Sequence, residues 1–371
     1  MIYFDNAATT FPKPKEVYDG INYAMQNYSF NAGRSSYKGA KDTYSMIEET
    51  RTKLANIVNT SSSNVVFTSS ATESLNLILR GCNLNLGDKV LVSPFEHNAV
   101  IRTLHDLKVE IIIIPFDKET WSLKENELKD IITLNKPKLV AISHVNNVTG
   151  FELPYEKIFE LCKQKDCITV LDCAQSFAIY PVDTTNTDFV VFAGHKSLYA
   201  MFGIAGYIKT GKTNLNLTKV GGTGSDSLNL EMPTIEPLRF EPGSPNSIGI
   251  YSINCAIDFL QKEDYKSIKK ELTNYLINEL KKIDGVTIYL PKDYISCGIV
   301  SFNVQGFMTD DLGTILAEEF NICVRTGYHC APYIHNFLDF KKNYGTVRVS
   351  LGIFNTKEEI KKLITALSEV V

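Results

Sequence analysis

The chain has 371 residues, 44% of them hydrophobic and 22% charged, which is typical of a globular protein with a large core. Its formal net charge of −4 predicts no nucleic-acid partner and no binding to an anionic membrane. No apolar run approaches the length of a membrane span, and the first residues lack a basic region followed by an apolar core. We therefore expect neither a membrane anchor nor a signal peptide.

Eight cysteines in so long a chain, without dense regular spacing, do not form a disulfide framework. Reduced thiols and a cytoplasmic location are the plain expectation. No group of cysteines and histidines has the spacing of a zinc site, so we expect no metal.

Residues 13–60 are predicted to be mostly helical, with an interruption at 31–37. From residue 64 onward, short apolar runs alternate with helical patterns, which predicts an α/β fold with a mainly parallel, doubly wound sheet. The predicted strands are 65–68, 90–93, 111–115, 139–144, 169–172, 189–193 and 203–208, with helices at 72–81 and 97–107.

The segment 211–247 is rich in Gly, Ser, Asn and Pro and is predicted to be a long irregular connection, of a kind that is often functional or reaches a neighbouring subunit. The rest is predicted to form a smaller α+β domain. We expect residues 1–12 to associate with this small domain, 13–247 to form the large domain and 248–371 to form the small one.

Lys196 follows the apolar strand 189–193 and a glycine. Ligands bind beyond the strand ends of open α/β sheets, and a partly desolvated lysine loses its proton readily and attacks carbonyls. These properties suit a Schiff-base lysine for pyridoxal phosphate, the alternative being a surface lysine after a strand.

Asp172 ends another apolar strand, and a buried carboxylate there needs a cationic partner. A protonated pyridine nitrogen would be such a partner, and Gln175 could donate a hydrogen bond to the ring oxygen. The alternative is a carboxylate that caps the following helix.

Two further strand ends carry candidate cofactor contacts. Ser70 and Glu73 have capping-box spacing, so the N–H of Ala71 and the Thr72 side chain could bind a phosphate, although taken alone the string is better explained by an ordinary helix cap. His97 could stack on a planar ring or act as an acid or base, or be a histidine in a turn.

The remaining candidates concern the substrate. Asn147, in a string that could equally be a simple turn, could donate to a cofactor or to a carboxylate. Arg348 lies in an alternating strand and could bind a carboxylate through two N–H groups, or be a solvated strand charge. Cys330 lies in a polar turn near Arg325 and His329, cations that would stabilise a nucleophilic thiolate.

Taken together, these strings resemble the cysteine desulfurase and selenocysteine lyase branch of the class V aminotransferase family, in its short-loop type. Those are fold-type I pyridoxal-phosphate enzymes, and the resemblance runs through essentially the whole chain. The matching strings are 3–10, 68–76, 96–97, 144–150, 172–175, 194–196, 239–246, 325–332 and 348–351.

The resemblance implies a role for each candidate. Lys196 would form the Schiff base with pyridoxal 5'-phosphate, His97 would stack on its ring, Asp172 would pair with the ring nitrogen and Gln175 would contact the ring oxygen. The phosphate would be held by Ala71, Thr72 and His195, together with Ser244 donated across a homodimer interface. Asn147 and Arg348 would hold the substrate carboxylate, and Cys330 would accept the sulfur.

The implied activity is the conversion of L-cysteine to L-alanine, with sulfur transferred to Cys330 as a persulfide and passed on to a sulfur-acceptor protein. The alternatives are another C–S or C–Se lyase acting on, for example, L-selenocysteine, a class V aminotransferase, and a non-catalytic scaffold. The chain departs from the family pattern at Ala193, at 197–202 and at 34–37, which leaves the cofactor prediction intact and the substrate less defined.

Overall fold

The computed structural model describes residues 1–371 except 33–35, 226–227, 292–293, 295, 339–343 and 371. Within the described residues a central sheet of seven strands has the order β2-β8-β7-β6-β5-β3-β4. Its strands are β2 (Val65–Thr68), β3 (Lys89–Val92), β4 (Glu110–Ile113), β5 (Leu139–Ser143), β6 (Ile168–Asp172), β7 (Phe189–Ala193) and β8 (Ala205–Lys209).

Most neighbouring strands of this sheet are parallel, which confirms the predicted α/β class. The exception is β8, which runs antiparallel to both β2 and β7. Successive side chains of a strand point to opposite faces. Accordingly, Val190 and Phe192 pack into the core on one face, and Phe189 and Val191 into the core on the other.

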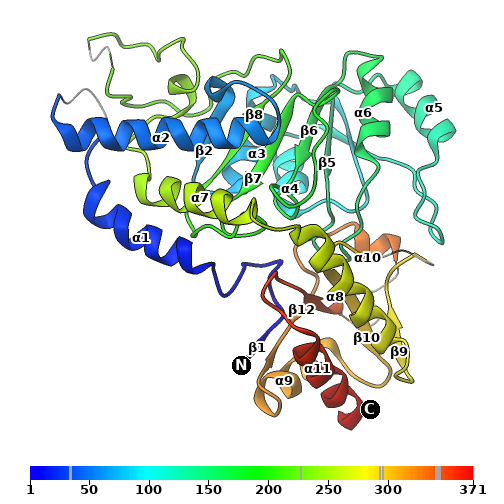
Figure 1. The fold of residues 1–371 in the computed structure, drawn as a ribbon. Coiled ribbons are helices and arrows are strands. Elements are labelled where there is room, and N and C mark those ends of the chain that lie inside the picture. The colour runs from blue at the N-terminus through cyan, green and yellow to red at the C-terminus, as the bar shows by residue number, and fades with distance from the viewer. Residues whose placement is uncertain (33–35, 226–227, 292–293, 295, 339–343, 371) are drawn as a thin grey trace.

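Helices surround this sheet (Figure 1). They are α1 (Lys15–Asn27), α2 (Lys38–Ile57), α3 (Ala71–Gly81), α4 (Asn98–Asp106), α5 (Glu125–Asn135), α6 (Tyr155–Lys163) and α7 (Ser247–Leu260). Helix α7 packs against α1 and α2. Up to the start of α7 at Ser247, the regular structure in the described part of 211–247 is confined to a short 3₁₀ helix, η2 (Leu238–Phe240), as predicted for an irregular connection.

The C-terminal part forms an antiparallel sheet of order β12-β13-β10-β9 with its own apolar core. Its elements are α8 (Tyr265–Leu280), β9 (Val286–Ile288), β10 (Ile299–Val304), α9 (Thr309–Glu318), β11 (Ile322–Cys323), β12 (Arg325–Gly327), α10 (Ile334–Phe337), β13 (Thr346–Ser350) and α11 (Lys357–Val370). The N-terminal strand β1 (Ile2–Tyr3) pairs in parallel with β11, so the first residues lie against this C-terminal part (Figure 1). The predicted domain boundaries stay a prediction.

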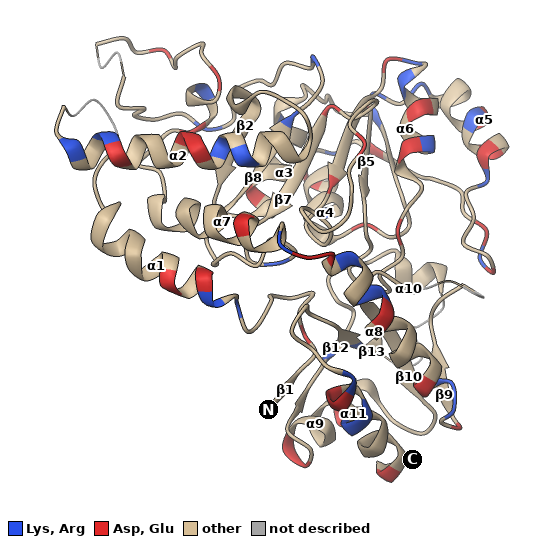
Figure 2. Ribbon diagram, in the orientation of Figure 1, with Lys and Arg blue, Asp and Glu red and all other residues tan. Residues whose placement is uncertain are grey.

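Acidic and basic residues are interspersed along the outer helices, for example on α2, α6 and α11 (Figure 2). None of the helices in the described chain is both long and apolar enough to cross a membrane. All eight cysteines are free thiols.

Candidate active site

A pocket lies at the carboxyl ends of the parallel strands, where polar side chains follow the apolar runs. It is a concave site that opens to solvent and is lined by both polar and apolar side chains, as small-molecule sites commonly are. The structure brings seven of the predicted site residues into its lining: Ala71, Thr72, His97, Asn147, Asp172, Gln175 and Lys196.

Lys196 and Asp172 are the charged pair of this pocket. Burial lowers the pKa of the Lys196 ammonium, and the negative charge of Asp172 opposes that effect. Burial likewise raises the pKa of the Asp172 carboxyl, which accepts a hydrogen bond of 2.9 Å from the backbone N–H of Ala174. Desolvation thus favours a neutral, nucleophilic amine beside a carboxylate that lacks a full cationic partner.

His97 lies at the start of α4. Its Nδ1 accepts a hydrogen bond of 3.0 Å from the N–H of Ala99. Burial and the nearby positive charge of Lys196 lower the pKa of the imidazole to about 4, so the ring is neutral at physiological pH. A neutral ring fixed by a hydrogen bond is suited to stacking on a planar ligand.

The first turn of α3 faces the same pocket. Ser70 caps this helix, because its hydroxyl accepts a hydrogen bond of 3.1 Å from the N–H of Glu73. The Glu73 carboxylate in turn accepts from the N–H of Ser69 at 2.7 Å. Ala71 and Thr72 therefore line the pocket from a helix N-terminus, where free N–H groups and the helix dipole attract anions.

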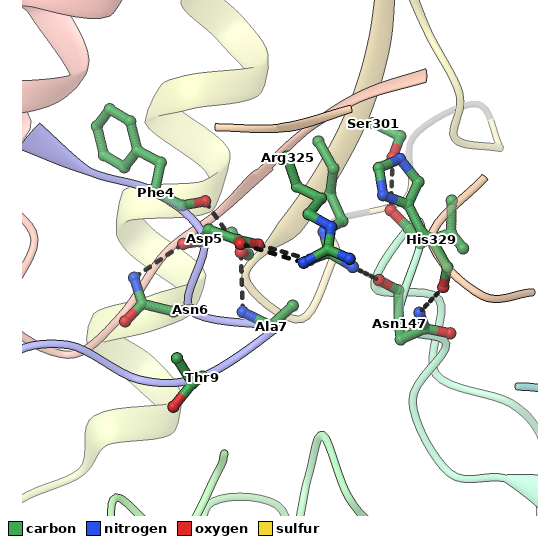
Figure 3. A network of polar contacts seen from close by, with 12 residues as sticks. Phe4, Asp5, Asn6, Ala7, Thr9, Asn147, Ser301, Arg325 and His329 are labelled. Atoms are coloured by element: carbon green, nitrogen blue, oxygen red, sulfur yellow. Dashed lines mark hydrogen bonds and ion pairs between the residues drawn. The ribbon is translucent and has the colours of Figure 1, made fainter. Parts of the chain in front are cut away.

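Arg348 is a buried side chain, 3% exposed, and not the solvated strand charge that the sequence left open. Its Nη1 donates to the carbonyl oxygen of Asn147 at 2.8 Å, and its Nη2 donates to Oδ1 of Asp5 at 2.7 Å. Figure 3 shows Asp5 and Asn147 on either side of this network of contacts, with Arg325 beside Asp5. Asn147 links the pocket lining directly to this arginine.

Cys330 is exposed and lies outside the pocket lining, in a loop held by hydrogen bonds. Its carbonyl oxygen accepts from the N–H of Asn98 at 2.7 Å, and the carbonyl of His329 accepts from Nδ2 of Asn147 at 2.7 Å. Both His329 and Cys330 have a positive φ, 50° and 57°, which turns the chain sharply at the thiol. A negative charge on Cys330 would favour the protonated, charged forms of both Lys196 and Arg348.

Two predicted phosphate contacts lie outside the pocket lining. The ring of His195 stacks on Phe202 at a centroid distance of 4.5 Å, and its buried Nδ1 has no hydrogen-bond partner within the described residues. Ser244 lies exposed in the segment after η2. The roles of both residues stay predictions.

Two of the three departures from the family pattern can be located. Ala193 ends β7 and is buried, and the 197–202 segment places Phe202 over His195. The third, 34–37, falls partly on residues 33–35, outside the described residues.

The family model for class V aminotransferases matches residues 2–363. The chain belongs to the class V aminotransferase family. A Vibrio cholerae protein named a probable cysteine desulfurase is 32% identical to it over 100% of this chain and 94% of that protein. A cysteine desulfurase of Yersinia pseudotuberculosis is 29% identical over 100% of this chain and 93% of its own length.

Among solved structures, a cysteine desulfurase of Thermococcus onnurineus is similar with a TM-score of 0.91 and 28% identity, covering 100% of this chain and 94% of that one. A cysteine desulfurase of Escherichia coli has a TM-score of 0.85 at 24% identity, over 99% of this chain and 94% of that one, a likeness of fold. The resemblance stated from the sequence is thereby confirmed.

The class V aminotransferase family depends on pyridoxal phosphate, and the pocket residues fit that cofactor. The side-chain amine of Lys196 makes no hydrogen bond or ion pair within the described part of the chain, so it is available to an aldehyde. The carboxylate of Asp172 suits a pyridinium nitrogen, and the N-terminus of α3 suits a phosphate.

Two residues of this region were not predicted as site residues. Asp5 lies two residues after the end of β1, and an acidic residue shortly after a strand was the available signal. Glu96 precedes His97 in the chain, and its carboxylate accepts from the N–H and the hydroxyl of Ser143 at 3.0 and 2.8 Å.

Proposed function

We propose that this chain is a pyridoxal-phosphate-dependent cysteine desulfurase, which converts L-cysteine to L-alanine and takes up the sulfur on Cys330 as a persulfide. The observation that supports it most is the joining of two sites by one residue. Asn147 lines the pocket of Lys196, accepts from Arg348 and donates to the loop of Cys330. The named relatives, similar over the whole chain, support the same activity.

The roles of the residues follow from their surroundings. Pyridoxal phosphate, when bound, would supply an aldehyde for amines and a ring that withdraws electrons from the substrate. It would be held by Lys196, Asp172, His97 and Gln175, with its phosphate at Ala71, Thr72 and His195. The neutral amine of Lys196 is suited to take a proton from the α-carbon of the substrate.

The sulfur step uses the thiol of Cys330. Its thiolate attacks the sulfur of L-cysteine, so an S–S bond forms while the Cβ–S bond of the substrate breaks. The carbon that loses sulfur gains a proton and leaves as L-alanine. The overall reaction, L-cysteine plus thiol to L-alanine plus persulfide, balances without an external oxidant. Asn147 and Arg348 hold the substrate carboxylate.

The partners are part of the same proposal. The exposed position of Ser244 supports a homodimer in which this residue completes the phosphate site of the partner subunit. The short hydrogen-bonded loop gives a persulfide on Cys330 little reach, so a dedicated acceptor protein would dock at the pocket mouth. Eight free thiols support a reducing, cytoplasmic setting.

The test compares two substitutions. Cys330→Ala should keep the cofactor's visible absorbance and slow alanine formation from L-cysteine by about 100-fold or more, because the sulfur acceptor is gone. Lys196→Ala should lose that absorbance band. Mass spectrometry of the wild-type protein during turnover should find one additional sulfur on Cys330.

Cys323→Ala is the matched control. This partly buried cysteine lies on β11, seven residues before Cys330 in the chain. It should turn over L-cysteine at the wild-type rate. Alanine formation by Cys330→Ala at the wild-type rate, or turnover without added sulfur on Cys330, would exclude the sulfur transfer proposed here.

A further inference from the structure

The guanidinium of Arg348 is fixed from two sides. Asp5 accepts from Nη2 and the Asn147 carbonyl accepts from Nη1, at 2.7 and 2.8 Å. One anchor lies in the N-terminal segment and the other in the loop after β5, and each binds a different terminal nitrogen of the guanidinium. The buried Nε has no hydrogen-bond partner within the described residues.

Asp5 is itself held by backbone hydrogen bonds on both sides. Phe4 donates to the carbonyl of Cys323 at 2.8 Å and accepts from the N–H of Ser350 at 2.6 Å. The N–H of Ala7 donates to the hydroxyl of Ser350 at 2.9 Å. Ser350 lies two residues beyond Arg348 on the same strand, so the carboxylate of Asp5 is tied to the strand that carries the arginine.

The charge of Asp5 is needed at this place. Arg325 is the second cation near its carboxylate, with Nη1 at 3.8 Å from Oδ2. Burial lowers the pKa of Arg348, and Asp5 opposes this effect. Removal of the carboxylate would leave a buried guanidinium without its anion, beside a second one.

We propose that Asp5 is a positioning residue, which orients Arg348 for the carboxylate of the substrate and so sets the preference for amino acids over amines. The inference rests on the proposed function, in which Arg348 binds that carboxylate. A guanidinium has five N–H donors, and the two anchors use two, which leaves three for a ligand. Asp5 and the substrate carboxylate would thus bind different N–H groups of the same guanidinium.

Two thiol analogues separate this role from a general loss of structure. 3-Mercaptopropionate carries the carboxylate without the amine, and cysteamine carries the amine without the carboxylate. In Asp5→Ala, calorimetry on the cofactor-loaded protein should show the dissociation constant of 3-mercaptopropionate raised about tenfold, because the arginine loses its orientation. That of cysteamine should change by less than about twofold. The KM for L-cysteine should rise by a similar factor, with kcat within about threefold.

Asp5→Asn keeps an oxygen that can accept from Nη2 but loses the negative charge, so it should recover part of the 3-mercaptopropionate binding and leave the dissociation constant about threefold above wild type. Asp310→Ala is the matched control, because Asp310 accepts from Thr326 on β12 and contacts neither arginine within the described residues. It should bind both analogues as the wild type does. Asp5→Ser is the second removal variant, used if Asp5→Ala fails to fold by circular dichroism.

Equal weakening of both analogues in Asp5→Ala, no weakening of either, or a loss in Asp5→Asn as large as in Asp5→Ala would overturn the positioning role. Arg348→Ala separates this from a failure of the proposed function. If Arg348→Ala binds 3-mercaptopropionate as tightly as the wild type, the role of Arg348 itself is wrong. If only Asp5→Ala is without effect, the inference about Asp5 fails alone.

Discussion

Glu96 joins the strand ends that build the pocket. Its carboxylate contacts the hydroxyl of Ser93 after β3 and accepts from both the N–H and the hydroxyl of Ser143 at the end of β5. In the sheet, Ser143 pairs with Asp172. Burial, together with a smaller contribution from the negative charge of Asp172, raises the pKa of Glu96 to about 7. Glu96 thus ties the end of β3 to the end of β5, beside the strand that carries Asp172.

Glu96→Gln should make the protein's stability less dependent on pH. The carboxyl pKa rises from 4.5 unfolded to about 7 folded, so the folded state binds more protons and the free energy of unfolding falls as pH rises through this window. The glutamine should remove up to about 3 kcal/mol of that fall. Denaturant unfolding of cofactor-free protein at pH 5 and 7.5 measures the difference from wild type.

The informative quantity is the difference from wild type, because the titration of His97 changes the free energy of unfolding with pH in the opposite direction. Its pKa is lowered to about 4, so protonation of the unfolded state favours unfolding as pH falls. Glu119→Gln, at an exposed site, is the control and should leave the pH dependence unchanged. A Glu96→Gln protein with the wild-type pH dependence would contradict the role given to this carboxyl.

At the scale of elements, the loop between β5 and α6 connects the large sheet to the C-terminal part. Asn146 shapes it, since its Oδ1 accepts from the N–H groups of Val148 and Thr149 at 3.0 and 2.8 Å. The Val148 carbonyl accepts from the hydroxyl of Ser301 at 2.6 Å, and Gly150 accepts from the N–H of Cys297 at 2.9 Å. This loop carries Asn147 to the Cys330 loop.

Gly150→Ala should destabilise the protein by about 2–4 kcal/mol, because two costs add at this position. Its φ is +69°, which strains a side chain, and an added Cβ would lie 2.0 Å from Oγ of Ser296 and 2.7 Å from the carbonyl of Ile299. Urea unfolding measures the change. Gly222→Ala, with nothing within 4 Å of its Cβ, should stay within about 0.5 kcal/mol of wild type. Equal stabilities of the two variants would refute the argument.

At the scale of the whole molecule, the proposed homodimer should build each site from two chains. Lys196→Ala and Ser244→Glu should each be inactive alone, because one removes the amine and the other places an anion at the phosphate. After the two are unfolded and refolded together, half of the dimers should be mixed, each with one intact site, which restores about a quarter of wild-type activity.

Activity returns in the mixed dimers only if Ser244 of one chain completes the phosphate site of the other chain. If Ser244 served the site of its own chain, each site of a mixed dimer would carry one defect and activity would stay absent. Analytical ultracentrifugation of the same mixture establishes that dimers are present.

Local sequence patterns were sufficient to predict the main sheet and several residues of the candidate site. Apolar runs bounded by polar residues predicted the strands of the main sheet, because burial on both faces leaves its mark in each short segment. The polar residues directly after those runs were predicted as site residues, because ligands bind beyond the strand ends of such sheets. The parallel arrangement brings the strand ends of Asp172 and Ser143 to the same edge.

Only the tertiary structure decided which distant residues meet. Asp5 and Arg348 lie 343 positions apart, and no local pattern records their pairing. Three other features could not be predicted from the sequence. They are the burial of Arg348, the antiparallel direction of β8, and the division of roles in which Asn146 shapes the loop and Asn147 contacts the Cys330 loop. Each depends on packing between segments far apart in the chain, whereas periodicity reports only the surroundings of a single segment.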